Sequence, residues 1–157
     1  MVSTTDNPTA GTGTRQHPIT VLLDRMRARL GEESGTGLWS MSAEQVADSL
    51  RAADGLAAQL ASVRLAVVRE ADRQDVAKAA GATSTANWLA GLLRLRPQEA
   101  SRSVKLAREL EAVLPLTELS LRAGEISVDH AQVIANAVRD MPVEAGPQIR
   151  AEAEQVL

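Results

Sequence analysis

The chain has 157 residues, of which 45% are hydrophobic and 24% charged, and its formal net charge is -3. This composition is typical of a globular domain and argues against wholesale disorder, and the absence of Cys excludes disulfides and thiolate metal sites. Phe and Tyr are also absent, and Trp39 and Trp88 are the only aromatic residues, which excludes the aromatic stacking platforms of single-stranded nucleic-acid binders. Leu, Val, Ile and Ala must build the core, and this set favours helices.

The N-terminal segment, residues 1–18, is small, polar and turn-forming, which predicts a disordered tail. It lacks the apolar region of a signal peptide, and no apolar run in the chain approaches the ~20 residues that span a bilayer. We therefore expect a cytoplasmic protein without a membrane partner. Residues 19–41 are expected to form a short amphipathic helix over 19–30 and a Gly-rich loop. The helix is expected to end at Gly31.

Residues 42–157 are expected to form a helical domain. A helix over 43–53 follows Ser42, and Asp54-Gly55 is expected to bend it or to start another helix. The next helix, over 56–80, ends at Gly81 and carries an apolar seam in steps of four and three. The seam consists of Leu56, Leu60, Val63, Val67 and Ala71. This spacing is typical of a helix hairpin within one chain, and it also suits a homodimer.

Five further helices are expected from capping residues and helix breakers. Ser84 or Thr83 caps a helix over 85–93, and Pro97 suits the first turn of a helix over 97–112. Gly124 closes a helix over 116–123, and Ser127 caps one over 128–139. The last helix, over 147–157, has no C-cap, so we expect the chain to be cut within it. The predicted fold is all-α, with about six or seven helices in an irregular bundle.

The net charge divides unevenly along the chain: residues 1–93 carry -1, residues 94–108 carry +4 and residues 109–157 carry -6. The cations of the middle segment are Arg94, Arg96, Arg102, Lys105 and Arg108, against Glu99 alone. On the helix over 97–112 the last three cations lie opposite the apolar face, as contact with phosphates and base edges requires. Glu109 lies beside them and is expected to neutralise part of this face. The alternative is a solvated helix face without a ligand.

The spacing of two of these helices predicts a possible helix-turn-helix at 84–112, because a three-residue turn joins the helix over 85–93 to the helix over 97–112. Such turns often place Gly after the first helix, whereas Arg94 stands there and adopts the required conformation only at some cost. The alternative is a plain αα-hairpin. In the DNA-binding interpretation the three cations on the second helix contact phosphates or base edges of double-stranded DNA, and Arg94 and Arg96 clamp phosphates at the turn.

The sequence offers few residues that could form a catalytic site. Glu125, Asp129 and His130 gather at the start of the helix over 128–139, where a His–carboxylate pair can do acid–base work. A carboxylate at a helix N-terminus and a surface histidine near its cap are the simpler interpretations. No nucleophile, P-loop, dinucleotide-binding glycine pattern or metal-ligand motif accompanies them. We expect no catalytic residue, no metal site and no cofactor.

Several short motifs follow one another in order: Trp88-Leu89-Ala90, Glu99-Ala100, Leu106-Ala107-Arg108, Leu114-Pro115, and GEISVDHA over 124–131. This order resembles the domain of unknown function 222, the 13E12-repeat family, over roughly residues 43–157. The resemblance implies the N-terminal region of an HNH-endonuclease-type protein. His130 is the only histidine after residue 17, so these residues assemble no His-Asn-His site, and nuclease activity is implied only for a longer protein that carries an HNH module.

We therefore expect a helical DNA-associated targeting domain that is non-catalytic by itself. The alternative is a helical protein-interaction or oligomerisation module with no nucleic-acid role. The apolar seam and the acidic last third of the chain favour this alternative.

Overall fold

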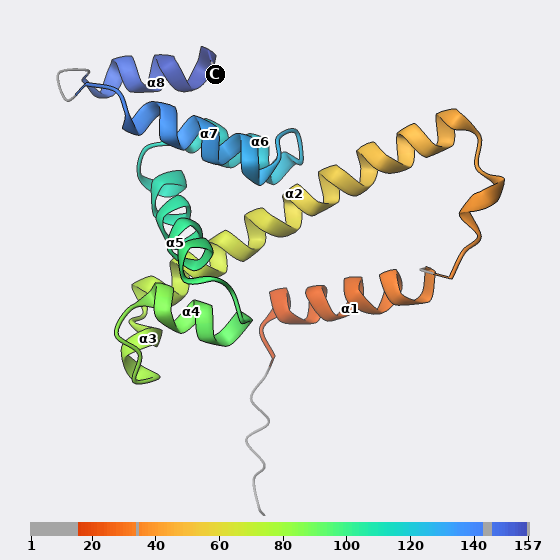
Figure 1. Ribbon diagram of the computed structural model, residues 1–157, viewed down its shortest axis with the longest axis horizontal. Helices are drawn as coiled ribbons and strands as arrows, with labels where there is room; N and C mark the ends of the chain where they lie inside the picture. The colour runs from red at the N-terminus through yellow and green to blue at the C-terminus, as the bar shows by residue number, and fades with distance from the viewer. Residues whose placement is uncertain (1–15, 34, 143–145, 157) are drawn as a thin grey trace, which may run out of the picture. The chain divides into compact units, whose positions relative to one another are not determined.

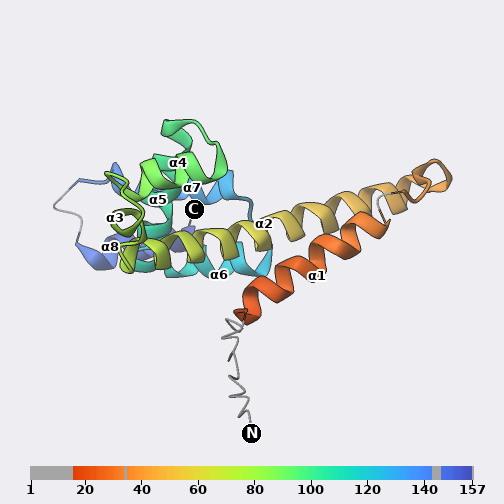
Figure 2. The same ribbon diagram turned by 90° about the horizontal axis from the view of Figure 1, so that it is seen from below.

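The computed structural model describes residues 16–33, 35–142 and 146–156, which form eight α-helices and one 3-10 turn and contain no strand (Figures 1 and 2). The prediction of an all-α fold is confirmed. The chain divides into two compact units, residues 1–42 and residues 43–157, which are described separately.

The first unit contains helix α1, Pro18–Glu33, and the 3-10 turn η1, Leu38–Ser40. The predicted end of the first helix at Gly31 is wrong, because α1 continues through this residue. Arg29 bonds Glu32 across the last turn at 2.9 Å, which supports the helix beyond the glycine. Most of the predicted N-terminal tail, residues 1–15, lies outside the described residues.

The second unit begins with α2, Ala43–Arg73, a single helix of 31 residues. The predicted bend or break at Asp54-Gly55 is wrong. Gly55 instead lets another backbone come close: a Cβ on Gly124, in the turn after α6 (Pro115–Ala123), would lie 2.8 Å from the carbonyl oxygen of Gly55. The glycine in α2 therefore marks a close packing contact between segments 69 residues apart in sequence.

The end of α2 also differs from the prediction of a helix to residue 80. Asp75 adopts the left-handed conformation with φ of 51°, which interrupts the helix. A short helix, α3, Val76–Ala79, follows, and Gly81 with φ of 72° ends it. Asp is one of the few non-glycine residues that tolerate this conformation, which is why a break forms here without a glycine.

The remaining helices start and end within one residue of the predicted limits. They are α4 (Thr85–Leu93), α5 (Pro97–Ala112), α6 (Pro115–Ala123), α7 (Val128–Arg139) and α8 (Pro147–Val156). Ser84 accepts a hydrogen bond from the N–H of Asn87, and Ser127 accepts one from the N–H of His130, so both predicted N-caps are confirmed. Gly124 closes α6 with φ of 82°.

Helix α5 is central to the core of residues 43–157 and packs against α2, α4, α6 and α7 (Figure 1). One face of α5 is buried, and its two leucines, Leu106 and Leu110, are 1% and 2% exposed. The other core residues come from each neighbouring helix. They include Leu65 and Val68 of α2, Leu89 of α4, Leu121 of α6, and Ala131, Ala135 and Val138 of α7.

The apolar seam predicted on α2 does not supply this core. The buried residues Ala58, Leu65 and Val68 lie on the side of the helix opposite Leu60 and Val67, since successive residues are rotated by about 100°. Val67 is 50% exposed, and of the five seam residues only Ala71 is buried. The stripe of α2 that contributes to the core is therefore not the apolar seam that the periodicity predicted.

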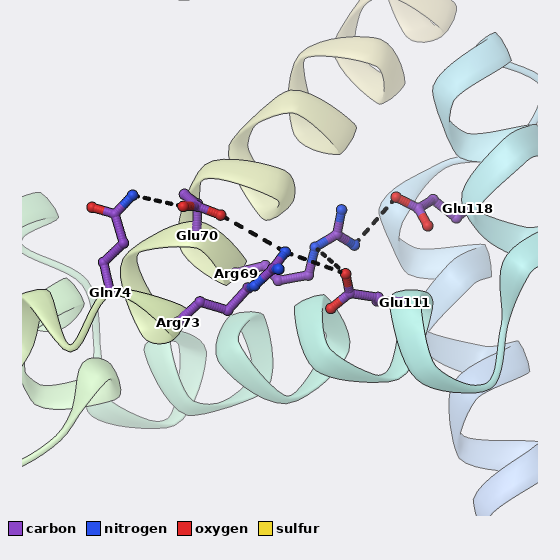
Figure 3. A network of polar contacts seen from close by, with 6 residues as sticks. All are labelled: Arg69, Glu70, Arg73, Gln74, Glu111 and Glu118. Carbon is purple, nitrogen blue, oxygen red and sulfur yellow. Dashed lines mark hydrogen bonds and ion pairs between the residues drawn. The ribbon is translucent and has the colours of Figure 1, made fainter.

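Ion pairs connect α2 to α5 and α6 (Figure 3). The guanidinium of Arg69 lies 3.3 Å from Glu118 of α6 and 3.6 Å from Glu111 of α5. Arg73 lies 3.7 Å from the same Glu111 carboxylate. Three helices therefore share one network of alternating charges at the edge of the core.

Helix α8 attaches to α6 through a buried carboxylate. Glu154 is 7% exposed and accepts hydrogen bonds from the backbone N–H of Thr117 at 2.7 Å and from its hydroxyl at 2.8 Å. The N-cap of α6 is Leu114, whose side chain cannot accept a hydrogen bond. Glu154 thus caps α6 from 37 residues away, a role that no local pattern predicts.

Candidate nucleic-acid interface

The turn between α4 and α5 consists of Arg94, Leu95 and Arg96. Arg94 adopts the left-handed conformation with φ of 55° and ψ of 41°, and its N–H donates to the carbonyl of Ala90. The N–H of Leu95 donates to the same carbonyl at 3.0 Å, which closes α4. Arg96 is extended, and Pro97 begins α5. Arg94 thus adopts the conformation that a helix-turn-helix often assigns to Gly, which costs about 1–2 kcal/mol because the residue is not glycine.

The outer face of α5 carries the cations that the sequence placed there. Arg102, Lys105 and Arg108 are exposed, and so are Arg94 and Arg96 at the turn. Four of these side chains make no ion pair or hydrogen bond within the described part of the chain. They are Arg94, Arg96, Arg102 and Lys105.

Arg108 differs from the other four because Asp72 of α2 binds it with two hydrogen bonds, one from Nε and one from Nη2, both 2.7 Å long. The same carboxylate accepts the hydroxyl of Thr85 at 2.6 Å. The hydrogen bonds from Arg108 and then from Thr85 lower the pKa of Asp72, although burial acts in the opposite direction. No local sequence pattern indicates this partner for Arg108.

Glu109 does not neutralise the basic face in the way that we predicted. Its carboxylate binds the guanidinium of Arg139 on α7, with Nε to Oε1 at 2.9 Å and Nη2 to Oε2 at 2.7 Å. This bond raises the pKa of Arg139. Glu109 therefore joins α5 to α7.

A depression lies on each side of this row of cations. Lys105 and Arg108 border a groove of about 470 Å³ between the start of α4 and α5, together with Ser84 and Ser101. Glu109 also lines this groove.

Arg102 borders the second depression, of about 240 Å³, between α2, α5 and α7, where Arg64 of α2 is its neighbour. Arg64 also donates a 3.3 Å hydrogen bond to Ser103. Arg64 was not among the predicted site residues, because its 38-residue separation from Arg102 gives no local signal. Two carboxylates, Glu99 and Asp129, line the same depression and moderate its positive charge.

At the start of α7, Ser127 caps the helix and also contacts the ring of His130. The hydroxyl of Ser127 lies 3.0 Å from Nδ1 of His130 and accepts the N–H of the same residue at 3.3 Å. Within the described ranges no three metal-ligating side chains gather closely enough to hold an ion. Nor does any helix in those ranges combine the length and apolar character needed to cross a bilayer.

A family model described as a domain of unknown function (DUF222) matches residues 19–157. The chain belongs to this family. The match includes residues 19–42, ahead of the motifs that carried the resemblance. Comparison with curated proteins and with solved structures gives no significant match.

Proposed function

We propose that this DUF222 chain is a DNA-associated targeting domain that binds double-stranded DNA through α5 and the α4–α5 turn and is non-catalytic by itself. The observation that carries the proposal is the set of exposed cations that make no ion pair or hydrogen bond with any residue that the structure describes. Arg94, Arg96, Arg102 and Lys105 form this set, in a chain whose net charge is -3. Phosphate contacts by such cations supply most of the affinity of DNA-binding proteins.

The arrangement of α4 and α5 supports the same interpretation. The three-residue turn between them has the length found in a helix-turn-helix, in which the second helix enters the major groove. Helix α5 has 16 residues and is about 24 Å long, which is ample for a groove about 12 Å wide. Its buried face anchors it to the core and directs the cations outward. The resemblance to HNH-endonuclease-type proteins suggests that the domain delivers a nuclease module to DNA.

The proposal is tested by the salt dependence of duplex binding. We compare the wild type with Arg102→Gln/Lys105→Gln by fluorescence anisotropy between 50 and 200 mM salt. Each lost phosphate contact lowers the log–log slope by about 0.9, so the wild type should lose about 12-fold more affinity than the double variant over this interval.

The matched control is Arg51→Gln/Arg122→Gln, which removes the same charge from exposed positions on α2 and α6. It should keep the wild-type slope. A flat salt dependence of the wild type, or equal slopes for the wild type and the α5 variant, contradicts the proposal.

The second candidate is an oligomerisation module, which the apolar stripe on α2 favours. Leu60 and Val67 lie opposite the face that packs in the core, and Val67 is half-exposed. Steps of four and three suit a second copy of the same helix. In this case sedimentation shows a concentration-dependent dimer that Val67→Glu dissociates. Such a dimer combined with no salt-sensitive DNA binding would replace the first proposal.

A further inference from the structure

The carboxylate of Asp72 lies where α2, α4 and α5 meet. It binds Arg108 of α5 through two hydrogen bonds of 2.7 Å and the hydroxyl of Thr85, the first residue of α4, at 2.6 Å. The side chain of Arg108 is nevertheless 61% exposed. Arg108 is therefore a surface cation with a fixed internal partner, on the same helix face as two cations that have none within the described ranges.

The bond between Asp72 and Arg108 competes with any phosphate. A guanidinium presents paired N–H groups to a carboxylate in the same way that it presents them to a phosphate, so Arg108 must release Asp72 before it can bind DNA with the same edge. Each of the two carboxylate oxygens already accepts one of these N–H groups. Neither Arg102 nor Lys105 faces such a competitor within the described structure.

We propose that Asp72 withholds Arg108 from DNA phosphate and thereby limits the affinity of the α5 face. The inference rests on the proposed function and refines its contact set to Arg94, Arg96, Arg102 and Lys105. The ion pair joins α2 to α5, and these two helices also share the buried core, to which Leu65 of α2 and Leu106 of α5 both belong, so their packing does not rest on the ion pair alone. The lowered pKa of Asp72 agrees with a carboxylate that stays charged beside a guanidinium.

The test is a gain of function in the full chain. Asp72→Asn keeps Oδ1, which accepts the hydroxyl of Thr85 and Nη2 of Arg108, but it replaces Oδ2 by an amide N–H₂ that faces Nε and removes the negative charge. One hydrogen bond to a neutral amide then replaces the two-bond ion pair, and a phosphate can displace it. The variant should make one more phosphate contact on a DNA duplex. Its salt slope should steepen by about 0.9, and it should lose about 3.5-fold more affinity than the wild type between 50 and 200 mM salt. Asp54→Asn changes the net charge equally at an exposed position of α2 and should keep the wild-type slope.

The variant Arg108→Gln completes a double-mutant cycle with Asp72→Asn. Alone it should keep the wild-type slope, and in combination with Asp72→Asn it should abolish the gain. Urea unfolding of the same four proteins confirms that each folds, and the two substitutions should not add, because both remove the same ion pair.

The outcomes separate this inference from the proposed function. Salt-dependent binding by the wild type with no gain, or a loss, in Asp72→Asn overturns the inference alone. An additive unfolding cycle also overturns it. The absence of salt-dependent binding by the wild type overturns both.

Discussion

Replacement of Gly124 by Ala should destabilise the fold by an amount that the backbone geometry defines. Gly124 has φ of 82°, a conformation that costs an L side chain about 1–2 kcal/mol. The new Cβ would also lie 2.8 Å from the carbonyl oxygen of Gly55 and 3.2 Å from its Cα. These are backbone atoms of α2, so they cannot move aside as a flexible side chain would, and overpacking of this kind costs about 1–3 kcal/mol. Alanine restricts the unfolded chain and returns about 0.4–1 kcal/mol. The net loss should be about 3 kcal/mol.

Gly81 provides the matched control for this substitution. It has a similar φ of 72°, but a Cβ there would meet nothing within 4 Å. Gly81→Ala should therefore lose only about 1 kcal/mol, from the backbone conformation alone. The difference between the two variants measures the close approach of the turn after α6 to α2. Urea unfolding followed by far-UV circular dichroism gives both values, and unchanged m-values show that the two-state comparison holds. Equal losses at Gly124 and Gly81 would refute the reasoning.

Two further predictions concern the buried and paired carboxylates. Glu154→Ala removes the acceptor for the N–H and the hydroxyl of Thr117, and it should lower the free energy of unfolding in urea by about 1–3 kcal/mol. Glu154→Gln keeps one oxygen and should lower it less. Equal losses in the two variants would contradict the capping role. Because the pKa of Asp72 is lowered in the folded state, its contribution to stability is complete above the ordinary Asp pKa of about 3.9 and is lost as the pH falls through the folded-state value. Stability measured from pH 6 down to pH 2 should therefore fall less steeply in Asp72→Asn than in the wild type, and parallel curves would show that the ion pair contributes nothing.

Prediction from the sequence worked where the interactions are short in range. The N-caps at Ser84 and Ser127 bond N–H groups three residues ahead, and Gly124 ends its helix through its own backbone conformation. Arg94 stands where a helix-turn-helix often has Gly, and the structure places it in the left-handed region. Prediction failed at Gly55, where a glycine was interpreted as a break although it serves a contact with a distant segment.

For the candidate interface, the sequence determined which cations lie on the outer face of α5, because the helical period fixes the direction of each side chain once one face is apolar. The sequence could not determine which of those cations remain available. Asp72 and Arg108 are 36 residues apart, Glu109 and Arg139 are 30 apart, and no periodicity relates such positions.

For α2, too, the sequence determined the helix, and contacts between distant segments determined its partners. The sequence by itself established a helical chain with a basic face within an acidic surrounding. Only the tertiary structure decided which side of α2 meets the core and which charges neutralise one another, because burial and ion pairing depend on segments that come together when the whole chain packs.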